Sequence, residues 1–108
     1  MVNRFNVKVT VVKKASTKDL WGSNTPATSK MEDVCPRFKV GQEFDVGEDG
    51  NMPEGFCPWA WNDVYGAYTH LCFGGDFPWV KESGTQLACC TDGFRPVFFK
   101  LERIEPER

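Results

Sequence analysis

The chain has 108 residues, a formal net charge of −2 and an aromatic content of 14%. Its thirteen basic residues are scattered along the chain, which argues against nucleic-acid binding through a basic patch. No apolar run reaches membrane-spanning length, and residues 1–14 lack the apolar stretch of a signal peptide, so we expect a cytoplasmic protein without a membrane partner. Because a chain of this size buries a single core, we predict one domain over residues 1–108.

The first half of the chain predicts two strands separated by a long loop. Apolar and polar residues alternate over residues 5–11, which is the pattern of a half-buried strand. Residues 15–34 are rich in Ser, Thr, Asn, Gly and Pro, which predicts a loop with one helical turn over residues 17–21, anchored by Trp21. A second short strand is predicted over residues 42–46.

The second half predicts one helix and a hairpin. The helix is expected to begin at Cys57-Pro58 and to end at Gly74, and Gly66 in its middle suggests close packing against another backbone. Extended runs over residues 85–90 and 96–104 predict a closing hairpin. We therefore expect an α+β fold, with a small, mostly antiparallel sheet or partial barrel of about four to five short strands packed with one aromatic helix.

The cysteines divide into two groups. Their odd number in a chain without an export signal argues against a disulfide framework, so the thiols are expected to be reduced. Cys35, Cys57 and Cys90 stand at bends between elements, where ligands and nucleophiles are usually presented. Cys72 and Cys89 share apolar faces of the helix and of a strand, so they are predicted to be core residues.

Cys57 is the first candidate for a reactive or metal-ligating sulfur. A cysteine at a helix N-terminus meets free backbone amides and the positive end of the helix dipole, which together stabilise a thiolate. His70 is predicted about 20 Å away near the other end of that helix, so a Cys-His catalytic pair is not expected. Each cysteine could equally be a buried apolar group.

The sulfur-rich bends suggest a metal site. Cys35, Cys57 and Cys90 could together bind zinc or an iron–sulfur cluster, with His70 or Cys72 as a fourth ligand. The sequence has no Cys-x-x-Cys pair, so the spacing does not identify the metal. Four aromatic residues near the helix ends could form a pocket beside the site or belong to the core: Trp59, Trp61, Phe77 and Trp79.

These motifs resemble those of an uncharacterised family of small proteins with repeated Cys-Pro motifs, found mainly in anaerobic bacteria and archaea. The matching stretches are Cys35-Pro36, residues 40–44, residues 57–60, residues 73–75 with Pro78-Trp79, and residues 90–101. The resemblance implies family cysteines at Cys35, Cys57 and Cys90 and names no reaction. The chain departs from the family pattern in its longer segment 15–34 and in Thr91, where proline is expected.

Three functions fit these observations. The first is a non-catalytic accessory protein that binds a metal ion or an iron–sulfur cluster through Cys35, Cys57 and Cys90. The second is a thiol-dependent enzyme with Cys57 as the thiolate, and the third is a structural subunit or binding module with buried structural cysteines. A protein partner or a homo-oligomer is compatible with all three.

Overall fold

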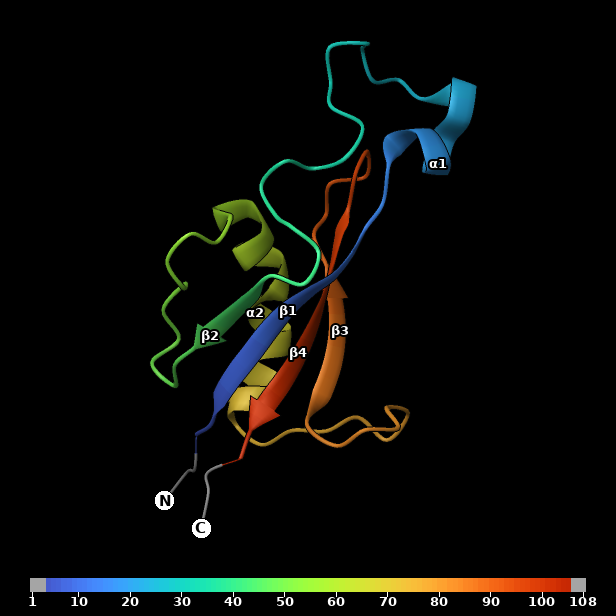
Figure 1. Ribbon diagram of the computed structural model, residues 1–108. Coiled ribbons are helices and arrows are strands. Elements are labelled where there is room, and N and C mark those ends of the chain that lie inside the picture. The colour runs from blue at the N-terminus through green and yellow to red at the C-terminus, as the bar shows by residue number, and fades with distance from the viewer. Residues whose placement is uncertain (1–3, 106–108) are drawn as a thin grey trace.

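The computed structural model describes residues 4–105, which form one antiparallel sheet and a long helix (Figure 1). The elements in chain order are β1 (Asn6–Lys14), α1 (Thr17–Trp21), the 3₁₀ helix η1 (Gly22–Asn24), β2 (Glu43–Val46), α2 (Pro58–Cys72), β3 (Thr85–Cys89) and β4 (Val97–Ile104). None of the helices in this range is both long and apolar enough to cross a membrane.

The sheet has the strand order β2-β1-β4-β3, and every neighbouring pair is antiparallel. Val9 lies at its centre, opposite Phe44 of β2 and Leu101 of β4. β3 and β4 form the predicted hairpin, and the sheet stays open between β2 and β3. The predicted α+β fold with a small antiparallel sheet and one aromatic helix is confirmed.

The core lies between α2 and one face of the sheet. The alternating apolar residues of the strands are fully or almost fully buried on this face: Val7, Val9, Val11, Phe44, Val46, Val97, Phe99 and Leu101. The opposite face carries charged side chains, among them Lys8, which lies 3.7 Å from Glu43 and 3.9 Å from Glu102. This one-sided burial explains the period-two pattern in the sequence.

Helix α2 begins and ends where its sequence predicts. Cys57 is its N-cap and Pro58 occupies the first turn, while Gly74 adopts a φ of 86° just beyond the C-cap. One face is buried against the sheet, and from it the Tyr68 hydroxyl donates a 2.6 Å hydrogen bond to the Gly47 carbonyl. Burial, with a further contribution from Cys72, raises the pKa of Tyr68 far above its usual value.

Gly66 does not have the predicted role. It is exposed, and a Cβ added there would meet no atom within 4 Å. Within residues 4–105 no other backbone approaches this position, so the suggestion of close packing is wrong.

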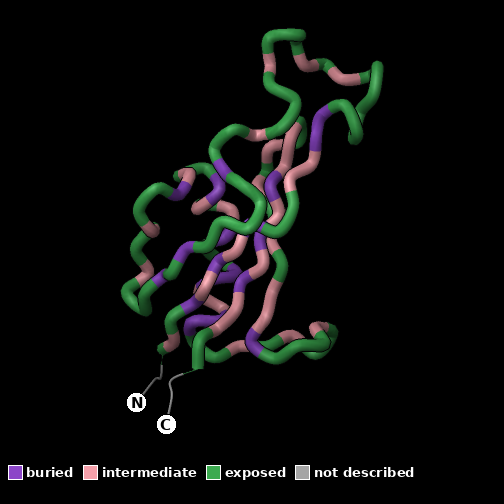
Figure 2. Tube along the Cα trace, in the orientation of Figure 1, coloured by how far each residue is buried: buried purple, intermediate pink, exposed green. Residues whose placement is uncertain are grey.

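A long arm between β1 and β2 extends past the end of the sheet where the β3–β4 hairpin turns (Figure 1). Most of it is exposed, as the green trace in Figure 2 shows. Its helical turn, α1, is capped by the Ser16 hydroxyl, which accepts from the Asp19 amide at 2.9 Å. Trp21 donates to the Gly93 carbonyl at 2.8 Å, so it fastens the arm to the hairpin as expected.

Candidate cysteine site

The three cysteines predicted at bends line one cavity of about 290 Å³. They come from three different parts of the chain: the arm, the start of α2 and the end of the hairpin strand β3. All three are partly buried and pack against the hydrophobic core. The remaining lining comes from Pro36, Arg37, Phe38, Trp59, Ala60, Asp92, Arg95 and Val97.

Cys57 is held at the cavity by the start of α2. It is the N-cap residue, with extended dihedral angles of φ −76° and ψ 123°, and its carbonyl accepts from the Trp61 amide at 2.8 Å. Its side chain makes no capping hydrogen bond to the helix. The thiol therefore does not cap the amides of the first helical turn.

Cys90 is held by β4 and by a polar clamp from α2. The Val97 amide donates to Cys90 Sγ at 3.3 Å, and the Cys90 amide donates to the Val97 carbonyl at 3.1 Å. The next residue, Thr91, donates its backbone N–H to Asp63 at 2.7 Å, and its hydroxyl accepts from the Trp59 indole at 2.8 Å. Proline at this position would lack both the amide hydrogen and the hydroxyl, which gives the departure at Thr91 a physical role.

Cys35 is placed by the aromatic core beneath it. Phe38, three residues further on, is buried and also lines the cavity. Its ring lies 5.1 Å from that of Phe56 and 5.3 Å from that of Phe99, both in edge-to-face or steeply inclined geometry. The Lys14 ammonium group also donates to the Phe38 carbonyl at 2.6 Å, which ties this end of the arm to β1.

Charged groups surround the thiols. Arg37, Asp92 and Arg95 all line the cavity. Arg95 Nε lies 3.4 Å from Asp92 Oδ2, a contact close enough for an ion pair, yet this buried nitrogen makes no hydrogen bond within residues 4–105. A guanidinium N–H directed beside the cavity is therefore left without an acceptor.

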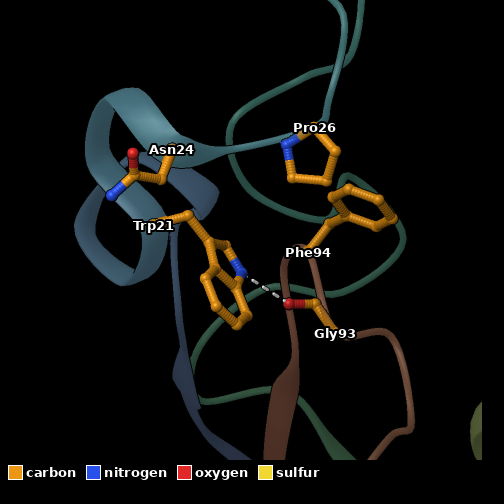
Figure 3. Close-up of a pocket in the computed structure, with 5 residues that line it drawn as sticks. All are labelled: Trp21, Asn24, Pro26, Gly93 and Phe94. Carbon is orange, nitrogen blue, oxygen red and sulfur yellow. Dashed lines mark hydrogen bonds between the residues drawn. The ribbon is translucent and has the colours of Figure 1, made fainter.

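A second cavity of about 300 Å³ lies on the other side of the hairpin turn (Figure 3). It is lined by Trp21, Asn24 and Pro26 from the arm and by Gly93 and Phe94 from the turn. Residues 92 and 95 line the cysteine cavity while residues 93 and 94 line this one, so the turn is a wall shared by both cavities.

The other predicted ligands lie elsewhere. Cys72 is buried in the core as predicted, near the far end of α2. His70 is also at that end, where its ring stacks on Phe77 with centroids 4.2 Å apart, and Phe77 in turn stacks on Trp79 at 4.6 Å. Neither Cys72 nor His70 lines the cysteine cavity, and of the four aromatic residues considered for a pocket beside the site only Trp59 does.

Cys89 contradicts its predicted place in the core. It is exposed, and its strand neighbour Leu87 is 71% exposed. Leu87 pairs with Lys100 of β4 and Cys89 pairs with Phe98, so both side chains lie on the face of the sheet that points away from α2. Leu87 and Cys89 do share one face of β3 as predicted, but this face is exposed and not part of the core.

No metal site is assembled in the described part of the chain. Among residues 4–105 there is no group of three or more His, Cys, Asp or Glu side chains that could hold a metal ion as they stand. The cavity therefore brings the three cysteines to one place without closing them around a common point.

Several residues of the site escaped the sequence analysis. Arg37 and Arg95, which line the cavity, and Asp63, which accepts from the Thr91 amide, were not singled out. The only available signal was position, because Arg37 follows Cys35-Pro36 and Arg95 follows the Cys90 turn.

Comparison with known proteins identifies no relative: no family model, no curated protein and no solved structure matches this chain. The resemblance to the small Cys-Pro family therefore stays a prediction.

Proposed function

We propose that the protein binds a thiophilic metal ion through Cys35, Cys57 and Cys90 and acts as a non-catalytic accessory protein. The observation that carries this proposal is the shared cavity, because three cysteines from distant parts of the chain line a space of about 290 Å³. Thiolates select soft or borderline ions such as Zn²⁺ and Cu⁺.

The donor set favours a single ion over an iron–sulfur cluster. A cubane or two-iron cluster is normally held by four cysteines, and the cavity offers three. Zinc is also bound by three protein ligands, with a fourth position left for water or for a ligand from a partner. The Val97 N–H directed at Cys90 Sγ resembles the outer hydrogen bonds that orient metal ligands.

Binding would draw the three sulfurs closer together than they lie in this structure. Cys35 belongs to the arm, outside every strand and helix, so it can approach Cys57 and Cys90 without a change in the sheet or in α2. The metal therefore would also fasten the arm to the rest of the molecule.

The test is metal content and metal affinity of protein purified without oxygen. We expect one ion per chain, or stoichiometric uptake of added Zn²⁺ by the reduced protein. Replacement of Cys35, Cys57 or Cys90 by Ser should lower the Zn²⁺ affinity by more than about 100-fold, since even outer-shell partners are worth 10- to 100-fold.

Cys89→Ser is the matched control, because Cys89 is adjacent to Cys90 but exposed on the open face of the sheet. It should leave metal binding unchanged. Wild-type protein that neither carries an ion nor binds added Zn²⁺, or a Cys89→Ser variant that loses the ion as fully as Cys57→Ser, would overturn the proposal.

A thiol-dependent activity of Cys57 is the second candidate, favoured by its position as N-cap of α2 in an open cavity beside Arg37 and Arg95. It predicts that Cys57 reacts with iodoacetamide at neutral pH several times faster than the exposed Cys89. Equal rates at the two cysteines, followed by mass spectrometry of the peptides, would rule it out. A cytoplasmic location, which keeps the thiols reduced, suits both candidates.

A further inference from the structure

The two free edges of the sheet differ in how they are protected. At one edge, β2 has four residues, of which Glu43 and Asp45 are charged, and such charges discourage pairing with another strand. At the other edge, β3 has the sequence TQLAC, without a charge or a proline. Its central residue, Leu87, is 71% exposed. An uncharged edge with an exposed leucine is the kind that pairs with another strand.

The hydrogen bonds of the hairpin show which backbone groups of β3 are free. The Arg103 amide donates to the Gly84 carbonyl at 2.7 Å, and the Cys90 amide donates to the Val97 carbonyl at 3.1 Å. In an antiparallel pair the bonded residues alternate along the strand, so the even-numbered residues of β3 turn their N–H and C=O toward β4. Thr85, Leu87 and Cys89 therefore turn theirs toward the free edge.

We propose that β3 pairs with β3 of a second copy of this chain, antiparallel and centred on Leu87, so that the two sheets become one. In this register Leu87 faces Leu87, Thr85 faces Cys89, and each of these pairs exchanges both of its outward N–H···O=C hydrogen bonds. The register uses every outward backbone group of β3. The pairing makes no use of the metal or of the cysteine cavity.

The side chains of β3 are complementary to themselves in the same register. Leu87 packs against its own copy on the open face, flanked by Thr85 and Cys89, and Gln86 meets Ala88 on the face toward α2. The strand contains no charge, so no like charges oppose each other within it. Two copies of this one strand satisfy all of their outward backbone groups and set no like charges against each other, which is why a second copy is the occupant we infer.

The loop before β3 offers further surface to the second copy. Phe77, Trp79 and Val80 line a cavity of about 530 Å³ together with the first residues of β3. Trp79 is 76% exposed. In an antiparallel arrangement the segment that follows Cys89 in the second copy runs past the start of β3, and therefore along this cavity.

The first test is the mass of the reduced protein by light scattering at about 0.2 mM, a concentration at which about 95% of the chains are dimeric when the Kd is about 1 μM. We expect twice the chain mass of 12.2 kDa for the wild type and a single chain mass for Leu87→Lys. Val40→Lys is the control, because Val40 is 62% exposed in the arm and lies outside β3, and this variant should stay dimeric. A wild-type mass of one chain, whether or not an extended peptide binds, would overturn the proposal.

The second test fixes the register. In Thr85→Cys the new thiol faces Cys89 of the second copy across about 5.5 Å between Cα atoms, which suits a disulfide. Oxidised glutathione should convert this variant to a covalent dimer, and adding Cys89→Ser should abolish the cross-link. Gln86→Cys, whose side chain lies on the other face, should not cross-link to Cys89. Cross-linking that persists after Cys89→Ser would contradict the register.

Discussion

The two ends of α2 are built in different ways. At the carboxyl end Arg103 of β4 is almost fully buried and donates to the Leu71 carbonyl at 3.3 Å, to the Gly75 carbonyl at 2.8 Å and to Asp76 at 3.0 Å. At the amino end Thr91 donates to Asp63 and accepts from the Trp59 indole in exposed hydrogen bonds, and three free thiols line a cavity. One end is closed by a charged network, and the other holds a cavity lined by three partly buried thiols.

This difference places the buried charged network and the proposed metal site at opposite ends of one helix. A buried guanidinium that donates to two carbonyls fixes the end of α2 and the loop after it, because one charged donor bridges the Leu71 and Gly75 carbonyls. The amino end of α2, where the three cysteines lie, can border a cavity because the Arg103 contacts hold the helix at its carboxyl end. The predictions below test this division, from the largest expected effect to the smallest.

Arg103→Ala should lower the free energy of unfolding by about 3 kcal/mol, because it leaves the two carbonyls and Asp76 without their charged donor. Urea denaturation measures this change. Lys100→Ala is the control, since Lys100 makes only long contacts at the protein surface, 3.7 Å to Glu82 and 4.0 Å to Glu102, and it should change stability by less than about 0.5 kcal/mol. If both variants lowered the free energy of unfolding by the same amount, the Arg103 contacts would not be a main source of stability at the carboxyl end of α2.

Asp63→Ala should lower the free energy of unfolding by about 1.5 kcal/mol, because Asp63 accepts from both the backbone N–H and the hydroxyl of Thr91. It should also weaken Zn²⁺ binding, since the clamp positions the turn that follows Cys90. Denaturation and Zn²⁺ titration measure the two effects. Asn62→Ala, at an exposed neighbouring position, should change neither the free energy of unfolding nor the Zn²⁺ affinity. Loss of stability with unchanged Zn²⁺ affinity would mean that the clamp does not position Cys90.

Gly66→Ala should raise the free energy of unfolding by about 0.5–1 kcal/mol. The residue is exposed in the middle of α2, its surroundings leave room for a Cβ, and alanine favours the helix. The thermal midpoint measures the gain. Gly75→Ala is the contrasting variant, because its Cβ would lie 2.5 Å from the His70 ring, so it should be destabilising. If Gly66→Ala lowered the free energy of unfolding instead, the prediction that this position has room for a Cβ would be wrong.

The sequence predicted the elements whose pattern reflects local geometry. Period-two alternation located β1 and β4, and Pro58 and Gly74 marked the ends of α2 within a residue or two. The bend positions of Cys35, Cys57 and Cys90 also selected residues that line one cavity. These signals depend on neighbours in sequence, which a single chain displays directly.

Features that depend on distant partners could not be predicted. Alternation in β3 shows that Leu87 and Cys89 share a face, but only the position of α2 decides that this face is open. The partners of Arg103 and of Thr91 lie 27 to 32 residues away in sequence, and nothing local marks them. Gly66 was misjudged for the same reason, since the space around it is a property of the packing.

The carboxyl end of α2 should also confer a dependence of stability on acid. The Gly84 amide and then Arg103 hold the pKa of Asp76 below its usual value. A carboxyl group with a depressed pKa in the folded state stabilises the fold above its unfolded pKa, and this contribution is lost as the pH falls through the folded pKa. The free energy of unfolding should therefore fall below about pH 4, and Asp76→Asn should remove that part of the decrease.

Ser83→Ala separates the causes of this effect. The Ser83 hydroxyl donates to Asp76 at 3.1 Å but contributes less to the lowered pKa than Gly84 and Arg103 do. Most of the acid dependence should therefore survive in Ser83→Ala, when denaturation is followed from pH 6 to pH 2. If Asp76→Asn kept the full acid dependence of the wild type, Asp76 would not be a main source of it, and the charged network at this end of α2 would stabilise the fold through the carbonyl contacts of Arg103 alone.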